Sequence, residues 1–279
     1  MAFATVNGIT IGYDDEGSRD GVPVVLVHGH PFNRSMWAPQ VGALTAAGYR
    51  VIAADLRGYG DTSVVPGVTL LAVFARDIAG LADYLGLDEV VLGGLSMGGQ
   101  IVMEFCRLFP GRVRGLLLAD TFAAAETPEG RAARNAMADR LVAEGMDGYA
   151  SEVLDKMIAP YNVTDLPEVA AQVLAMMRTT APEGAAAALR GRALRRDYGQ
   201  LLTEVPVPAL VVVGADDEYT PVSDAEFLHR QIRGSVLTVI KGAAHLPNLE
   251  RPAEFNAALG QFLVRVASAA SAASSAPGG

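Results

Sequence analysis

The sequence predicts an α/β protein in which a mostly parallel, doubly wound sheet carries an inserted helical cap. Short apolar runs recur along the chain, and helix-like amphipathic stretches separate most of them. This alternation is interrupted once, between Asp120 and Pro206, where helical patterns continue without a comparable strand. The length of 279 residues and the hydrophobic content of 51% suit one large globular domain with such an insertion.

The elements of the predicted sheet follow from local patterns. Alternating residues on either side of Asn7-Gly8 predict a hairpin over residues 3–14. Continuous apolar runs, typical of strands buried on both faces of a parallel sheet, then predict strands at residues 24–27, 51–54, 90–92, 116–119, 210–213 and 236–240. Helical periodicity predicts helices over residues 70–85 and 224–232.

The cap is predicted from helix-start signals. An acidic residue and a proline in the first turn mark starts at residues 127–129, 165–168 and 181–183. We therefore divide the chain into a first core part (1–121), a helical cap (122–205), a second core part (206–266) and a tail (267–279). The low-complexity composition of the tail predicts disorder.

Composition excludes several classes of protein. The net charge of −9 leaves no basic surplus for binding nucleic acid. A single cysteine, Cys106, excludes an intramolecular disulfide and is expected to be a small buried hydrophobe. The N-terminus lacks signal-peptide features, and no apolar run reaches the length of a membrane span. We expect a cytoplasmic protein without a membrane partner. A homo-oligomer is compatible with the sequence, but no pattern specifies one.

The most informative motif is Gly94-Leu95-Ser96-Met97-Gly98. It lies between the apolar run 90–93 and the amphipathic stretch 100–105, so the motif falls at a strand-to-helix turn. A G-x-S-x-G motif in this context predicts a nucleophilic serine on a sharp turn. The alternative is a glycine-rich loop that happens to contain a serine, and other residues must decide between the two.

A serine nucleophile needs a general base, and histidine is the usual one. Of the four histidines, His28 is expected to order the loop after its strand, and His229 lies within a predicted helix. His245 follows the last predicted strand, where small residues let a loop approach Ser96. His245 is therefore the predicted base.

The base needs a carboxylate, and the transition state needs an oxyanion hole. Chain order places the acid after a strand between Ser96 and His245, which leaves Asp216, Asp217 and Glu218 as candidates and Asp120 in reserve. The expected oxyanion donors are the backbone N–H groups of Met97 and His30. A second hypothesis for His30 makes its side chain an additional acid or base.

With these residues in this order, the chain resembles the α/β-hydrolase superfamily and is similar to its 3-oxoadipate enol-lactonase and perhydrolase-type esterase branch. The motifs that carry the resemblance are residues 28–31, 55–60, 94–99, 214–217 and 243–256. The resemblance implies the α/β-hydrolase fold. It also favours Asp217 over Asp216, because the family's acid usually falls third after the glycine of its motif. Phe or Trp is common in the branch where this chain has His30.

The sequence thus predicts a cofactor-free and metal-free serine hydrolase that cleaves a small carboxylic ester or lactone through an acyl-enzyme. The alternatives are a C–C bond hydrolase, a perhydrolase or a thioesterase with the same triad, or a non-catalytic ligand receptor. An anionic substrate would need a cation near the pocket. The cap offers several arginines, most of which solvated helix faces would explain: Arg131, Arg134, Arg140, Arg178 and Arg190.

Overall fold

The computed structural model describes residues 1–274 and contains one eight-stranded sheet. In chain order its strands are β1 (Ala2–Val6), β2 (Ile9–Gly17), β3 (Pro23–Val27), β4 (Arg50–Ala54), β5 (Val90–Leu95), β6 (Val113–Ala119), β7 (Ala209–Gly214) and β8 (Val236–Ile240). Their order across the sheet is β1-β2-β4-β3-β5-β6-β7-β8. Only the β1–β2 and β2–β4 pairs are antiparallel in this sheet of the described chain. The predicted mostly parallel, doubly wound sheet is confirmed.

The predicted N-terminal hairpin is also confirmed. Val6 pairs with Ile9, so only Asn7 and Gly8 form the connection, with φ angles of 50° and 77°. Positive φ at both positions is the geometry of a tight turn whose twist matches that of the strands.

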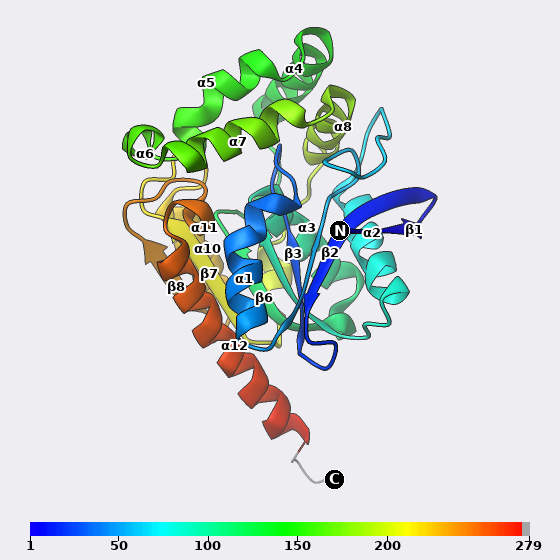
Figure 1. Ribbon diagram of the computed structural model, residues 1–279, viewed down its shortest axis with the longest axis vertical. Coiled ribbons are helices and arrows are strands. Elements are labelled where there is room, and N and C mark those ends of the chain that lie inside the picture. The colour runs from blue at the N-terminus through cyan, green and yellow to red at the C-terminus, as the bar shows by residue number, and fades with distance from the viewer. Residues whose placement is uncertain (275–279) are drawn as a thin grey trace.

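Helices cover both faces of the sheet (Figure 1). One face carries α1 (Ala38–Ala46), α11 (Pro247–Glu250) and α12 (Pro252–Ser274), together with the 3-10 turn η1 (Arg34–Trp37). The other carries α2 (Leu71–Tyr84), α3 (Met97–Leu108) and α10 (Val222–Gln231), with the 3-10 turn η2 (Pro110–Arg112) after α3. The predicted helices over 70–85 and 224–232 correspond to α2 and α10.

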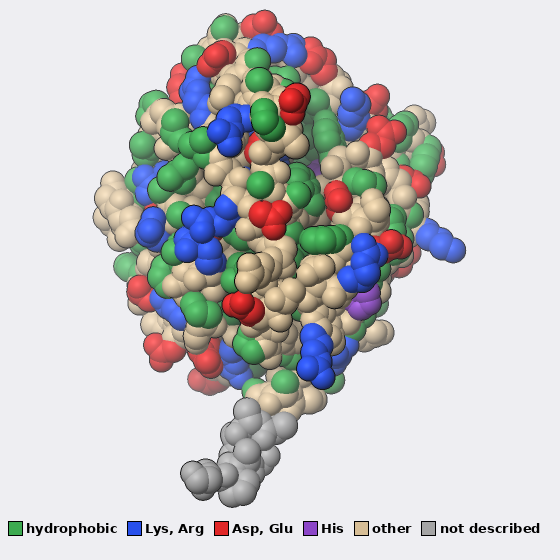
Figure 2. Space-filling model, turned by 180° about the vertical axis from the view of Figure 1, so that it is seen from behind, with side chains coloured by type: hydrophobic (Ala, Val, Ile, Leu, Met, Phe, Trp, Pro, Cys, Tyr) green, Lys and Arg blue, Asp and Glu red, His purple; other side chains and the backbone are tan. Residues whose placement is uncertain are grey.

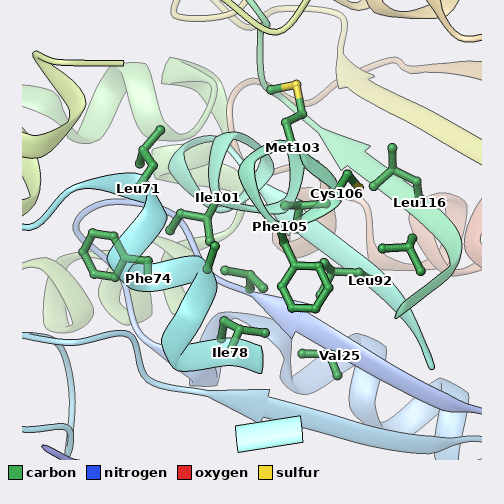
Figure 3. Packing of buried hydrophobic residues seen from close by; sticks show 14 of the residues in the cluster. Val25, Leu71, Phe74, Ile78, Leu92, Ile101, Met103, Phe105, Cys106 and Leu116 are labelled. Carbon is green, nitrogen blue, oxygen red and sulfur yellow. The ribbon is translucent and has the colours of Figure 1, made fainter. Parts of the chain in front are cut away.

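Strand β3 shows why apolar runs rather than alternating residues predicted these strands. Val25 and Val27 belong to the hydrophobic cluster on the α2 and α3 side, whereas Val24 and Leu26 belong to the cluster on the α1 and α12 side. Figure 3 shows Val25 beneath the aromatic and aliphatic side chains of the first cluster. Cys106 is buried in that cluster, and burial raises the pKa of its thiol to about 12, so it packs as the expected small hydrophobe.

Strand β8 differs from the expectation of burial on both faces. Four of its five residues are partly or largely exposed, and only Ile240 is buried. The reason is its place at the edge of the sheet, where it has β7 as a neighbour on one side. An apolar run therefore predicted the strand correctly but not its burial.

Between β6 and β7 the described chain contains six helices and no strand. They are α4 (Pro128–Glu144), α5 (Asp147–Met157), α6 (Pro160–Asp165), α7 (Pro167–Thr179), α8 (Pro182–Arg192) and α9 (Gly199–Thr203). Figure 1 shows α4 to α8 together above one end of the sheet, as the cap of the predicted fold class requires. Thr127 accepts a hydrogen bond from the Gly130 amide at 3.0 Å and so caps the start of α4.

The C-terminal part of the chain is more regular than its composition suggested. Helix α12 continues to Ser274, through the first part of the segment 267–279 for which we expected disorder. Alanine has the highest helix propensity, so an alanine-rich extension can prolong a helix that is already packed. The remainder of that predicted tail, 275–279, lies outside the described residues.

The surface carries mixed charge. On the face shown in Figure 2, basic and acidic side chains are interspersed without a continuous patch of either sign. Within residues 1–274, no helix combines the length and the apolar character that crossing a bilayer requires.

Candidate active site

Ser96 occupies a sharp turn between β5 and α3. Its backbone has φ 57° and ψ −117°, which is uncommon for a residue other than glycine. The turn is possible because Gly94 and Gly98, two positions to either side, have no side chain. A Cβ on Gly94 would lie 2.3 Å from the carbonyl carbon of Gly98, and one on Gly98 would lie 2.2 Å from the Val27 oxygen. The Ser96 amide donates to the Ala119 carbonyl at 2.9 Å, which anchors the turn to β6.

His245 and Asp217 form a buried pair beyond the carboxyl ends of β8 and β7. His245 Nδ1 lies 2.7 Å from Asp217 Oδ2. Asp217 Oδ1 also accepts from the amides of Tyr219 and Thr220, at 2.8 and 3.2 Å, and Oδ2 accepts from the Thr220 hydroxyl. Burial opposes ionisation of Asp217, but His245 and the hydrogen bonds from Thr220 outweigh it and hold the pKa of the carboxyl below its ordinary value.

The other acidic candidates have different surroundings. Asp216 is exposed and accepts a hydrogen bond from the Tyr161 hydroxyl of the cap, away from His245. Asp120 is buried after β6, and its Oδ1 accepts from the Gly214 amide at 2.8 Å. Its Oδ2 has no hydrogen-bond partner among the described residues. Burial and the nearby charge of Asp217 raise the pKa of Asp120 well above its ordinary value.

The described part of the chain contains one group of side chains that could ligate a metal ion. Its members are Asp120, Asp217 and His245, whose donor atoms lie within 4.8 Å of one another. The donor chemistry would suit a cation, but His245 Nδ1 and Asp217 Oδ2 already bond to each other. The geometry therefore favours orientation of the imidazole over ligation of an ion.

Ser96 and His245 lie on the wall of one cavity, of about 170 Å³, between the core and the cap. The core supplies His30, Ser96, Tyr219, Thr220 and His245, and the segment between β6 and β7 supplies Phe122, Arg134, Tyr149, Met157, Leu189 and Arg192. Among residues 1–274, no hydrogen bond joins the Ser96 hydroxyl to His245. Such catalytic hydrogen bonds are often long without substrate and tighten when it binds.

The loop after β3 passes beside Ser96. A Cβ added to Gly29 would lie 3.0 Å from the Leu95 oxygen and 3.2 Å from Ser96 Cβ, so a side chain there would be tightly packed and its neighbours would have to move slightly. His28 holds the loop: its Nε2 accepts from the Leu56 amide at 2.9 Å, and its Nδ1 lies 2.8 Å from the Gly29 oxygen. The amide of Met97 is the first of α3 and has no acceptor within the helix.

The side chain of His30 faces the same cavity. Its Nδ1 lies 2.8 Å from the Tyr59 hydroxyl, and its buried Nε2 has no partner among the described residues. Burial, together with the nearby charges of Arg192 and Arg134, lowers the pKa of His30 well below its ordinary value. The imidazole is therefore neutral near neutral pH, which weakens the hypothesis that it is an additional titrating acid.

Two buried charged residues of this region were missed by the sequence analysis. Glu250 accepts hydrogen bonds both from the loop before His245 and from the cap. Arg192, at the end of α8, lines the cavity. Of the cap arginines named in the sequence analysis, Arg134 alone does so. A run of glycine and alanine from Gly184 to Ala188 precedes Arg192, and such a run is a signal of a helix packed closely on all sides.

Comparisons with known proteins identify the family and its fold. Residues 24–258 match the model of the Alpha/beta hydrolase family. The 3-oxoadipate enol-lactonase 2 of Acinetobacter baylyi is 29% identical over 261 residues, which cover 94% of this chain and 96% of the relative.

Two solved structures extend the comparison. A thermophilic esterase from Thermogutta terrifontis, solved with malate bound, has a TM-score of 0.91 and 38% identity, covering 95% of this chain and 98% of that one. The enol-lactonase from Burkholderia xenovorans has a TM-score of 0.88 and 29% identity, covering 94% and 100%.

Proposed function

The chain belongs to the alpha/beta hydrolase family, and from this premise we propose that it is a serine hydrolase that cleaves a small carboxylic ester or lactone through an acyl-enzyme intermediate. Its similarity to esterases and enol-lactonases supports an enzyme that acts on ester or lactone bonds. The observation that carries the serine mechanism is the 2.7 Å contact of His245 with Asp217 beside a cavity that Ser96 also lines.

In the proposed mechanism the Ser96 hydroxyl attacks the carbonyl carbon while His245 Nε2 takes its proton. Asp217 holds the imidazole through Nδ1 and stabilises the imidazolium that forms. The backbone N–H groups of Met97 and His30 donate to the oxyanion. His245 then returns the proton to the leaving alcohol. A water molecule, deprotonated by His245, attacks the acyl-enzyme and releases the acid and the free Ser96 hydroxyl.

The test compares the native protein with Ser96→Ala on a panel of short acyl esters and small lactones. We expect kcat to fall by roughly 10⁴- to 10⁶-fold, because the alanine has no nucleophile. Ser18 is an exposed serine directly after β2, so Ser18→Ala is the matched control and should retain activity. A Ser96→Ala protein with near-native turnover would contradict the mechanism. A covalent acyl adduct detected by mass spectrometry, absent in Ser96→Ala, would identify the intermediate.

Other chemistries can use the same triad, so the products decide between them. C–C bond hydrolysis, peracid formation and thioester hydrolysis would each give a different product from the same nucleophile. A receptor on this fold would bind a ligand tightly with negligible turnover. The names of the similar enzymes favour the ester or lactone substrate over these alternatives.

A further inference from the structure

One ring nitrogen at the cavity beside Ser96 has no role in the proposed mechanism. His30 lines this cavity and is only 5% exposed, and its Nε2 has no hydrogen-bond partner among the described residues. The backbone N–H of the same residue is a proposed oxyanion donor, so the side chain begins beside the reacting carbonyl. A buried polar atom without a partner is costly, and a ligand that supplies one removes the cost.

The other ring nitrogen of His30 is turned toward Tyr59. His30 Nδ1 lies 2.8 Å from the Tyr59 hydroxyl, and Tyr59 is buried outside the cavity wall. On the cavity side the imidazole neighbours Tyr149, and the two ring centroids lie 6.3 Å apart. Nε2 is therefore the polar atom of this ring that a molecule bound in the cavity can reach.

The position of Tyr59 is fixed by the loop that carries it. Its amide donates to the Leu56 carbonyl at 2.9 Å, and its carbonyl accepts from the Thr62 amide at 3.0 Å. A Cβ on Gly58 would lie 2.7 Å from Gly184 Cα, so the loop also rests directly against α8. Burial raises the pKa of the Tyr59 hydroxyl, which therefore keeps its proton. This O–H group is held in one place before any ligand binds.

The hydrogen bonds of this pair indicate which ring nitrogen of His30 carries the proton. The imidazole is neutral, because burial and the charges of Arg192 and Arg134 lower its pKa well below its ordinary value. Among residues 1–274, the recorded partner of the Tyr59 hydroxyl is His30 Nδ1. With the proton on Nδ1, the buried Tyr59 O–H would have no acceptor and Nε2 would have no donor. With the proton on Nε2, Tyr59 donates to Nδ1 and only the Nε2–H group is left unpaired.

The two arginines of the cavity wall do not alter this assignment. Arg134 and Arg192 line the same cavity, and a guanidinium could donate to an unprotonated Nε2. Within the described chain neither does so, and their side chains donate instead to Glu126 and Gln100. The contacts therefore favour a neutral Nε2–H group at the cavity, separate from the two guanidinium groups.

We propose that His30 Nε2–H donates a hydrogen bond to an uncharged oxygen of the substrate, and that Tyr59 is the positioning residue that fixes this tautomer. This rests on the proposed function and adds a requirement on the substrate, which is an ether or hydroxyl oxygen besides the scissile ester or lactone. An ionised group would bring a larger desolvation cost than one neutral donor offsets, whereas an uncharged oxygen needs one such donor. A site with a buried donor discriminates against the analogue that lacks the acceptor.

The first test uses pairs of esters in which one oxygen replaces one methylene group. Methyl 3-methoxypropanoate and methyl pentanoate differ in the acyl part, and 2-methoxyethyl acetate and butyl acetate differ in the alcohol part. His30→Phe keeps a ring but removes the donor. The ratio of kcat/KM for the ether ester over its alkyl partner should therefore fall by roughly 5- to 100-fold in at least one pair.

Comparing ratios within one protein cancels any general loss of activity. His229→Phe, on α10 and outside the cavity wall, is the matched control and should keep the native ratios. Unchanged ratios in both pairs for His30→Phe would overturn the proposal.

The second test needs no turnover and so separates this proposal from the proposed function. Proton–nitrogen NMR spectra of protein with nitrogen-15 histidine report which ring nitrogen is protonated, and His30→Phe identifies the His30 signals. We expect the proton on Nε2 in the native protein and a mixture of tautomers in Tyr59→Phe. A native proton on Nδ1 would overturn the proposed donor, and an unchanged tautomer in Tyr59→Phe would overturn the positioning role of Tyr59.

Binding to the Ser96→Ala protein tests the substrate contact itself. The imidazole signals of His245, which lines the same cavity, follow titration with each ester of the two pairs. Adding His30→Phe to Ser96→Ala should weaken binding of an ether ester relative to its alkyl partner by roughly 5- to 100-fold. That result would support the contact even if no ester were hydrolysed, whereas an unchanged ratio of Kd values in both pairs would overturn it.

Discussion

Glu250 Oε1 accepts a hydrogen bond from the backbone N–H of Ala244 at 2.8 Å, one residue before His245. Its other oxygen accepts from the Ala159 amide at 2.8 Å and from the Asn162 side chain at 2.6 Å, both at the α6 end of the cap. One buried carboxylate therefore joins the loop that carries the proposed base to the cap that closes the cavity. Movement of either segment would be transmitted to the other through this residue.

We expect Glu250→Gln to lower both stability and activity. In the native protein both carboxylate oxygens accept from backbone N–H groups. The glutamine side chain would replace one of these oxygens by an NH2 group, so a buried backbone N–H would lose its acceptor. The free energy of unfolding should fall by about 1–3 kcal/mol, measured by urea denaturation. The kcat for ester hydrolysis should fall as well, because the loop before His245 loses its anchor.

Glu89→Gln removes an exposed carboxylate far from the cap and is the matched control. If Glu250→Gln matched this control in both stability and kcat, Glu250 would not couple the cap to the His245 loop.

Asp217 and its neighbour Asp216 provide a matched pair for testing the proposed acid. Asp217→Asn should reduce kcat by roughly 10⁴-fold, because an asparagine beside His245 Nδ1 favours the wrong tautomer of the imidazole. Asp216→Asn should keep native activity, since that carboxylate bonds to Tyr161 on the surface. The measurement is steady-state hydrolysis of one ester by both variants. Equal losses of kcat in the two variants would contradict the proposal that Asp217 is the acid that orients His245.

The elements that sequence predicted well are those with a strong local pattern. Strands buried on both faces, such as β3 and β5, have continuous apolar runs, and the two-residue turn of the first hairpin has its own signature. The short helices α6 and α9 were not predicted individually. They span one or two turns, and much of what determines their limits is packing against the core rather than local sequence.

The residues of the candidate site also differ in how well local sequence predicts them. The turn around Ser96 could be predicted because its glycines are required by contacts within a few residues and with one strand. The place of Arg192 on the cavity wall could not, because the residue to which it donates a hydrogen bond, Gln100, is 92 residues away in the chain. The number of arginines in the cap cannot distinguish those on a solvated helix face from one buried at the cavity wall.

Gly98 should not tolerate a side chain. An added Cβ would lie 2.2 Å from the Val27 oxygen and 2.8 Å from that of His28, so the turn or the loop after β3 would have to move. We expect Gly98→Ala to destabilise the fold by about 1–3 kcal/mol and to displace the oxyanion donors, with a loss of kcat.

Gly42→Ala is the control for Gly98, because no atom lies within 4 Å of the added Cβ and the position is within α1. It should be neutral or stabilise the protein by up to about 1 kcal/mol. Thermal or urea denaturation of both variants, with ester hydrolysis, is the measurement. Gly98→Ala with native stability and turnover would show that the turn is not as constrained as its contacts indicate.

Asp120 should make the protein less stable as pH rises. Its pKa in the folded state is raised well above the ordinary 3.8, chiefly by burial and then by Asp217. At a pH between the ordinary pKa, which applies to the unfolded chain, and the raised pKa of the folded protein, the unfolded chain has lost this proton while the folded protein retains it. The unfolded state then binds fewer protons, so the free energy of unfolding falls with increasing pH, by at most about 1.4 kcal/mol per pH unit.

Asp120→Asn should remove this slope. The asparagine can keep the acceptor for the Gly214 amide and is neutral, as the protonated carboxyl is. Asp217 adds no slope at these pH values, because its lowered pKa makes its contribution complete above its ordinary value of 3.8. Urea denaturation from about pH 5 to about pH 8 should show the variant gaining stability relative to the native protein as pH rises. The exposed Asp88→Asn is the control and should run parallel to the native curve. If Asp120→Asn ran parallel too, the proton would not be held at Asp120.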